Sequence, residues 1–308
     1  HSLDNTGQGV ARKNGFVLFV PRGLPGDTLR VRIRKLKKRY GSAEIVEVIS
    51  PSKNRIDAKC DSFDNGCGGC QWLDYSYQEQ LKAKTTSLRE TLKRIGRLNV
   101  NIDSIVAAPR IHGCRNKLSL SRDGNGRFGL FRERSRIAVD ASSCRMQPGE
   151  ILRVGSILAE SDLPDTVSQI HLRADGKGGV GVCFYAAENA TSADIDFLRE
   201  STRRRAIAKS VTGACVRKGR RYHHLTGRKH LEPVVSGVRY ELPLDSFFQT
   251  NYDQAATLHR LALDYLEPAG DEAILDLYCG VGFFSLYLAA STRGKSAFVT
   301  GVESDRAA

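Results

Sequence analysis

The chain has 308 residues, and a hydrophobic content of 41% argues against general disorder. Lys and Arg outnumber Asp and Glu by 47 to 34, and the net charge of +13 favours a polyanionic partner. No apolar run reaches the about 18 residues of a transmembrane helix, and the first residues lack a signal-peptide pattern. We therefore expect no membrane partner and a cytoplasmic location.

Residues 5–57 have the pattern of a small β domain. Short apolar runs at 16–20, 29–33 and 43–49 are separated by turns rich in Gly and Pro. Several short strands at this spacing predict a small β-barrel.

Three arginines alternate with apolar residues in the second of these runs. Arg30, Arg32 and Arg34 therefore share one face of the expected strand. Such a face could line a phosphate backbone, and a solvated charged strand is the alternative.

Cysteines provide the next signal. The chain has eight, and Cys60, Cys67 and Cys70 lie within eleven positions, among glycines that free the backbone to wrap a metal centre. This clustering, without a secretion signal, favours a reducing compartment over disulfides. Three thiolates need a fourth ligand from a distance. The spacing fits zinc and an iron–sulfur cluster equally, and both alternatives stay open.

A helix is expected over 76–95, because leucines recur there at helical spacing and Gly96 follows. Ser76 and Glu79 have the spacing of a capping box at its start.

Residues 100–235 read as a mixed α/β region. Strands are expected at 117–122, 127–131, 169–173 and 180–185, with hairpin turns at 124–126 and 175–179. Arg115, Asn116 and Lys117 precede the first of these strands, and two cations beside an amide suit phosphate contact or base reading. An ordinary polar loop is the alternative. A later stretch is also basic, with Arg217, Lys218, Arg220 and Arg221.

Residues 240–308 predict a βαβ unit. After a helix over 251–265, an apolar strand over 273–278 runs into Gly280 and Gly282, then a helix over 283–290 and a strand over 297–302. Glycines let a ligand approach the backbone, and an acid at the end of the second strand can accept from ribose hydroxyls.

Glu303 follows Gly282 by 21 residues and is this acid. Ser285 takes the place of the third glycine of the dinucleotide fingerprint, which favours S-adenosylmethionine (SAM) over NAD. The segment 246–251, with two Phe and Gln249, could stack on and hydrogen-bond a cofactor or base, although helix-entry packing would explain it too.

Taken in order, these segments resemble the RNA 5-methyluridine methyltransferases, with the best match to the iron–sulfur branch that modifies large-subunit ribosomal RNA. The resemblance implies an N-terminal TRAM domain, which is an oligonucleotide-binding barrel. It also implies a 4Fe–4S cluster on Cys60, Cys67, Cys70 and, after a Val-Asp stretch, Cys144.

By the same resemblance, Gln249, Tyr278 and Glu303 contact SAM, together with the glycine turn at Gly280 and Gly282. Position 283 is often Asn in relatives and is Phe here, so that contact departs from the pattern.

The implied reaction is methyl transfer from SAM to C5 of a uridine, with 23S ribosomal RNA as the first expectation and transfer RNA as an alternative. A non-catalytic RNA-binding module and a zinc-stabilised structural protein are further alternatives. The family's nucleophilic Cys and its base lie beyond residue 308, so no catalytic residue is assigned, and we expect this chain alone to be an inactive monomer.

The expected fold is multidomain α/β. It has an OB-like barrel at 1–58 and a central mixed α/β region with the cluster at 59–238. The start of a Rossmann-like SAM methyltransferase domain, incomplete at the last residue, follows at 239–308. Packing of the 76–95 helix on the last domain is left open.

Overall fold

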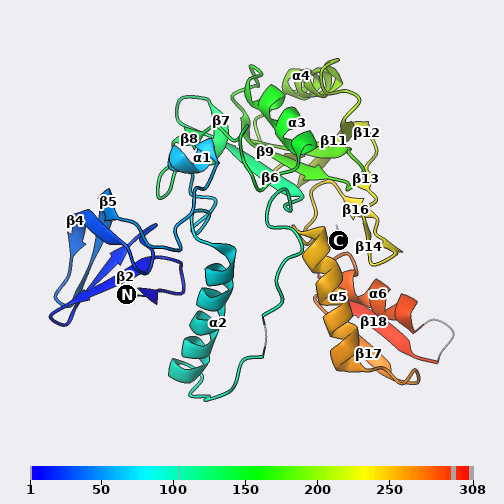
Figure 1. The fold of residues 1–308 in the computed structure, drawn as a ribbon. Helices are drawn as coiled ribbons and strands as arrows, with labels where there is room; N and C mark the ends of the chain where they lie inside the picture. Colours follow the sequence, from blue (N-terminus) through cyan, green and yellow to red (C-terminus); the bar gives the residue numbers. More distant parts are fainter. Residues whose placement is uncertain (1, 104, 293–295, 305–308) are drawn as a thin grey trace. The chain divides into compact units, whose positions relative to one another are not determined.

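The computed structural model describes residues 1–308 except 1, 104, 293–295 and 305–308. The chain divides into two compact units, His1–Ala107 and Ala108–Ala308 (Figure 1). Among the described residues, no helix has the length and apolar character needed to cross a membrane.

The first unit begins with a five-stranded sheet in the order β1-β2-β3-β5-β4. Its strands are β1 (Ser2–Leu3), β2 (Gly9–Lys13), β3 (Phe16–Val20), β4 (Thr28–Leu36) and β5 (Tyr40–Ser50). The three predicted strands are confirmed, with β4 and β5 longer than expected. Strand pairing among the described residues gives a sheet with β1 and β4 at its edges, and no pairing between these edges closes it into the small barrel that we expected.

Two helices follow in this unit, α1 (Asp61–Asp64) and α2 (Tyr77–Arg94). The predicted helix over 76–95 is confirmed, but its capping box is wrong. The backbone N–H of Ser76 donates to the carbonyl of Asn54, so it is not available to Glu79. Glu79 instead pairs with Lys82, at 2.6 Å.

A seven-stranded sheet organises the second unit, in the order β12-β11-β10-β9-β6-β7-β8. Its strands are β6 (Lys117–Arg122), β7 (Phe128–Phe131), β8 (Ala138–Val139), β9 (Val167–Ala174), β10 (Val180–Ala186), β11 (Val211–Lys218) and β12 (Arg221–Gly227). The four strands expected in this region are confirmed, and both hairpins join antiparallel neighbours. β6 pairs with β9, so the sheet brings together segments far apart in the chain.

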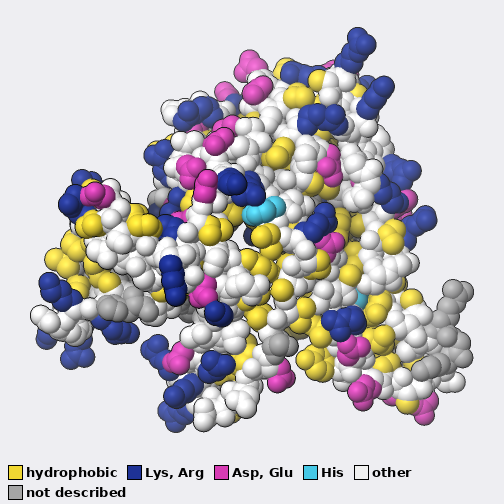
Figure 2. All heavy atoms as spheres, in the orientation of Figure 1, with side chains coloured by type: hydrophobic (Ala, Val, Ile, Leu, Met, Phe, Trp, Pro, Cys, Tyr) yellow, Lys and Arg dark blue, Asp and Glu magenta, His cyan; other side chains and the backbone are white. Residues whose placement is uncertain are grey.

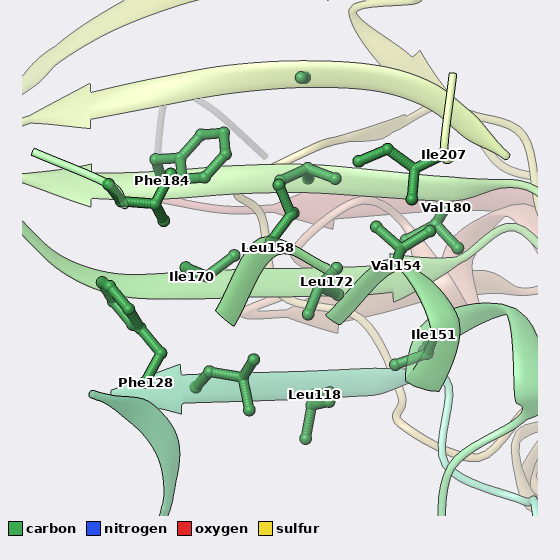
Figure 3. Packing of buried hydrophobic residues seen from close by; sticks show 14 of the residues in the cluster. Leu118, Phe128, Ile151, Val154, Leu158, Ile170, Leu172, Val180, Phe184 and Ile207 are labelled. Carbon is green, nitrogen blue, oxygen red and sulfur yellow. The ribbon is translucent and has the colours of Figure 1, made fainter. Parts of the chain in front are cut away.

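Two helices cover one face of this sheet, α3 (Gly149–Ala159) and α4 (Ser192–Arg203). Figure 3 shows α3 directing Ile151, Val154 and Leu158 toward strand residues such as Ile170 and Leu172, and all five side chains are fully buried. Val216 and Leu198 extend this core toward α4. The helices therefore cover one face of the sheet, and the other face is left to other segments of the chain.

Part of the opposite face is covered by the segment that follows. Four two-residue strands pair there: β13 (His230–Leu231) with β16 (Leu242–Pro243), and β14 (Val234–Val235) with β15 (Val238–Arg239). Leu231 and Leu244 pack so closely over Gly181 of β10 that a Cβ there would lie 2.7 Å from the Leu244 side chain. A second core therefore begins on this face, around Cys183 and Cys215.

The second unit ends in the expected βαβ arrangement. Helix α5 (Tyr252–Leu266) leads to β17 (Ala273–Leu277), α6 (Phe283–Ser291) and β18 (Phe298–Val302). β17 and β18 are parallel and in continuous register. The carboxyl ends of both strands therefore lie at the same edge, next to the glycine turn.

Candidate functional site

The turn between β17 and α6 has an unusual backbone. Tyr278, Gly280 and Gly282 have φ values of 62°, 54° and 77°, in the left-handed region. Gly282 is the N-cap of α6, and the Tyr278 side chain is 87% exposed. A non-glycine residue in this region is uncommon and marks turns with a special purpose. Gly280 and Gly282, which we predicted to bind a cofactor, are also needed for the turn itself, because the backbone has a positive φ at both positions.

Two carboxylates hold this turn in place. Oδ2 of Asp276 accepts from the backbone N–H of Ser285 at 3.1 Å and from its hydroxyl at 2.6 Å. Oε2 of Glu303 accepts from the N–H of Gly280 at 2.9 Å. The structure thus brings the predicted acid to the predicted glycine turn, where Glu303 also fixes the turn itself. Spacing alone does not predict the link from Ser285 to Asp276, although Ser285 occupies the position of the third glycine in the dinucleotide fingerprint.

The 246–251 segment is held from the central sheet. The side-chain amide of Asn116 donates to the carbonyl of Gln249 at 2.8 Å, and its backbone N–H donates to the carbonyl of Thr250 at 2.7 Å. Arg173 donates to the carbonyl of Ser246 at 3.0 Å. Asn116 is 4% exposed, so its side-chain amide forms its hydrogen bonds within the protein. Its predicted contact with RNA gains no support from this position.

Aromatic packing joins this segment to the glycine turn. The ring of Phe248 lies edge-on to Phe283, the first residue of α6, with centroids 5.6 Å apart. Phe283 is 7% exposed and stacks on His259, so the residue that departs from the family pattern serves packing. Phe247 is 74% exposed and Gln249 is half-buried. The two predicted cofactor segments therefore lie side by side.

His259 on α5 was missed at the sequence level. It is fully buried, its Nε2 lies 2.9 Å from the carbonyl of Phe283, and its Nδ1 lies 3.1 Å from the hydroxyl of Ser236. A carbonyl can only accept, so Nε2 is assigned the proton. Burial lowers the pKa of His259 and keeps the ring neutral. Tyr240 donates to the same carbonyl at 2.9 Å, so two side chains anchor the start of α6.

The cysteine segment belongs to the first unit. Cys60 and Cys67 are buried, and Cys70 packs against the same small core around Phe63. The N–H of Gly69 points at Sγ of Cys67, 3.4 Å away. Burial raises the pKa of Cys67. The raised pKa favours the protonated thiol of Cys67, so a bound metal would have to displace this proton.

A guanidinium fastens this segment to the sheet of the first unit. Arg22 donates to the carbonyls of Phe63 and Cys67, at 2.7 Å each, and lies over the Phe63 ring. Cys144 is buried in the second unit. Across the described parts of the chain, no three His, Cys, Asp or Glu side chains form a group that could hold a metal ion. The four-cysteine site therefore stays a prediction.

The predicted RNA-binding arginines of β4 all have acidic partners. Arg30 pairs with Glu47, while Arg32 and Arg34 both pair with Glu44 of the neighbouring strand. The arginine side chains are 59–65% exposed. Their predicted common face is accessible, but two carboxylates offset much of its charge.

The other predicted RNA-binding cations lie in the second unit. Arg115 is exposed, whereas Lys117 is half-buried, and burial followed by the nearby Arg173 lowers the pKa of Lys117. Lys and Arg side chains are spread over the face drawn in Figure 2, with acidic side chains among them. On the face drawn, the basic side chains therefore do not gather in a single patch.

The geometry of the turn and its two strands is that of a known class of fold. A parallel strand pair with a glycine turn at its carboxyl edge, and a carboxylate at the end of the second strand, is typical of α/β folds, in which ligands bind at this edge of the sheet. The sequence comparisons narrow the class. The chain belongs to the RNA methyltransferases that carry a TRAM domain, and the TRAM domain model matches residues 1–46.

Two relatives illustrate this membership. An uncharacterized RNA methyltransferase of Thermosynechococcus vestitus is 33% identical over 98% of this chain and 71% of its own length. Another, from Listeria monocytogenes, is 29% identical over 98% of this chain and 70% of its own length.

A solved structure shares the fold. The tRNA (uracil-54, C5)-methyltransferase of Pyrococcus abyssi, in complex with S-adenosyl-L-homocysteine, superposes with a TM-score of 0.66. It is 23% identical and covers 97% of this chain and 80% of that structure. The likeness shows a shared fold and covers residues of both units.

Proposed function

We propose that this chain is the RNA-handling and cofactor-binding part of an enzyme that transfers a methyl group from SAM to C5 of a uridine. The observation that carries the proposal is the glycine turn fixed by Asp276 and Glu303, next to the segment that contains Gln249. Membership of the RNA methyltransferases supplies the general reaction. The resemblance of the ordered motifs supplies the uracil C5 position.

Each residue of the turn has a role in this proposal. SAM, when bound, supplies the electrophilic methyl group. The acidic Glu303 suits a ribose, because a carboxylate accepts from hydroxyls. The exposed ring of Tyr278 offers a flat apolar surface, and the left-handed glycines let a ligand approach the backbone. Asn116 and Arg173 hold the carbonyls beside Gln249 and so orient that segment.

The chemistry on the base needs groups that we do not assign in residues 1–308. C5 of uracil is a poor nucleophile, and the resemblance implies that a cysteine thiolate adds to C6 and a base removes the C5 proton. The target base would leave its stack to be reached. Cys279 follows Tyr278 within the cofactor turn, so we do not assign it as the nucleophile. We predict that this chain alone transfers no methyl group.

We propose ribosomal RNA of the large subunit as the substrate, with transfer RNA as the competing choice. We also propose that residues 1–58, 59–238 and 239–308 serve as the TRAM part, the cluster-bearing central part and the methyltransferase part.

Calorimetric titration with SAM tests the cofactor site. We expect binding that Glu303→Gln and Gln249→Ala each weaken by about ten-fold, because each loses polar contacts to the cofactor. Glu241→Gln is the matched control, since that side chain is 79% exposed on the same unit. A chain that binds RNA but no SAM would be a non-catalytic RNA-binding module. Methyl transfer by the natural gene product to ribosomal and transfer RNA then identifies the substrate.

We propose, in addition, a 4Fe–4S cluster on Cys60, Cys67, Cys70 and Cys144. Three buried or half-buried thiols around one small core, with an N–H directed at Cys67, are suited to this ligand. Methyl transfer requires no electron, so we propose a structural role for the cluster. It would stabilise the segment that Arg22 anchors to the sheet. Four-thiolate zinc is the rival occupant.

Anaerobic purification separates these occupants. We expect brown protein with iron and acid-labile sulfide, both lost in Cys70→Ser and retained in Cys114→Ser. Colourless protein loaded with zinc would defeat the cluster.

A further inference from the structure

The open part of the central sheet carries a row of side chains at one register level. Tyr222 of β12 pairs with Arg217 of β11, Arg217 with Tyr185 of β10, Tyr185 with Gln169 of β9, and Gln169 with Ser121 of β6. We name these five residues the aromatic row. Partners at one register level point to the same side of a sheet. The row therefore crosses five strands on one face.

This face is the one that α3 and α4 do not cover. Within β10, Phe184 packs under the helices, so its neighbour Tyr185 points to the other side. The segment with Leu231 and Leu244 packs over Gly181, further along β10. Tyr222 is 37% exposed, and the other four members are half-buried. Tyr185 also packs against the second core, and the exposure of Tyr222 shows that solvent reaches the row on this face.

We propose that the aromatic row is a binding surface for single-stranded RNA, with bases stacked on Tyr222 and Tyr185 and the Arg217 guanidinium between them. The inference rests on the proposed function only in taking RNA as the partner. Aromatic rings on a sheet stack on unpaired bases, whereas paired bases in a duplex are not available for this.

The rings are held in place for this role. The imidazole of His171 packs against the Tyr185 ring at a tilt of 48°, with centroids 4.3 Å apart, and its Nε2 lies 3.0 Å from Oε1 of Gln169. Arg217 is held by Asp245 at 2.9 Å. A pre-ordered surface loses less freedom when a flexible strand binds. Asp245 immediately precedes the 246–251 segment, so the row also adjoins the cofactor site.

The charge at the edge of the row suits a phosphate backbone. The turn between β11 and β12 presents the exposed Arg220, and the exposed Arg221 alternates with Tyr222, so Arg221 lies at the edge strand β12 with its side chain toward the other face. The nearby acids are Asp245, whose side chain is 7% exposed against Arg217, and Glu188, which lies beside Gly219. Among the described carboxylates, none forms an ion pair with either hairpin arginine. Cations beside stacking rings are the combination that single-stranded nucleic acid requires.

Fluorescence anisotropy with a labelled oligouridine, which forms no duplex, tests the surface. We expect Tyr222→Ala and Tyr185→Ala each to weaken binding about ten-fold, and Tyr222→Phe to bind within about two-fold of the parent, since it keeps the ring. Phe197→Ala is the control, because that ring is 40% exposed on α4, which covers the other face. Equal affinity of Tyr222→Ala and the parent would overturn the proposal, as would equal competition by duplex RNA.

A second measurement uses the parent protein, so that the test does not depend on a variant that fails to fold. Oligouridine containing 4-thiouridine is cross-linked to the parent protein, and adducts are mapped by mass spectrometry. We expect adducts on the peptides that contain Tyr185 or Tyr222, and adducts confined to other peptides would contradict the inference. SAM titration of Tyr222→Ala separates the two proposals: intact SAM binding with weakened RNA binding assigns the defect to the row. If no variant binds SAM, the proposed function fails while the RNA result stands.

Discussion

Two arginine-rich strands look alike in the sequence and differ in the structure. In β4, Arg30, Arg32 and Arg34 lie across from glutamates of β5 and pair with them. In the β11–β12 hairpin, Arg220 and Arg221 have no ion-pair partner among the described carboxylates. The difference shows that the number of cations in a segment does not give the positive charge available to a phosphate. That available charge also depends on the acidic residues of the neighbouring strand.

The largest expected effect follows from reversing the hairpin charges. Arg220→Glu combined with Arg221→Glu should weaken binding of single-stranded RNA roughly ten- to hundred-fold and reduce the magnitude of the salt slope by about 1.4. Arg32→Glu combined with Arg34→Glu should have a smaller effect, because those cations are already paired. Anisotropy over a salt series measures both. A larger effect in β4 would reverse the comparison.

The next effect concerns Asn116, which sits between two predicted RNA-binding cations but is buried. Asn116→Ala should lower the free energy of unfolding by about 2 kcal/mol, because the carbonyl of Gln249 loses its amide donor. Urea denaturation gives this value. The salt slope of RNA binding should not change, whereas Arg115→Ala should change the slope and not the stability. The reverse pattern would restore Asn116 as an RNA contact.

Lowering the pH should reduce the free energy of unfolding of the second unit, because His171 becomes protonated on unfolding. Burial, with help from Lys117 and Arg173, lowers the pKa of His171 to about 4 from an ordinary value of 6.5. Between these values the unfolded state binds the proton and the folded state does not, so stability rises with pH and is lost as pH falls. After allowance for partial exposure, the loss is about 2 kcal/mol. Denaturation at pH 4 and pH 7 should show a smaller difference in His171→Gln than in the parent.

The smallest effect releases charge on β4. Glu44→Gln removes the partner of both Arg32 and Arg34, so RNA should bind about two- to three-fold more tightly at low salt. The gain should vanish at high salt. Anisotropy at two salt concentrations measures this, and Glu133→Gln in the second unit is the control. No gain at low salt would remove β4 from the RNA-binding surface.

Local patterns predicted most of the elements because their causes are local. The glycine turn, the two hairpins and the α5–β17–α6–β18 order all follow from turn residues and periodicity. Pairing across strands could not be predicted in this way. Arg32 meets Glu44, and Tyr185 meets Gln169, only through the register of the sheets. The capping box at Ser76 failed because Asn54, distant in sequence, accepts the N–H that the box requires.

The candidate site shows the same division. Gly280, Gly282 and Glu303 could be chosen from spacing, and the structure brings Glu303 to Gly280. His259 could not be chosen from spacing, because its role depends on the carbonyl of Phe283, and only folding brings that carbonyl within hydrogen-bond distance. Its position four residues after the buried Ala255 was the available signal, and that pattern predicts burial without naming a partner.

The shared carbonyl of Phe283 has a consequence for the order in which the protein is made. Its two donors, Tyr240 and His259, leave the ribosome before Phe283 does, because synthesis runs from the amino terminus. Glu303, which holds Gly280 from the other side, is added only afterwards. Both donors are therefore synthesised before their shared acceptor, and the turn acquires its last restraint only when Glu303, which follows β18, has been added.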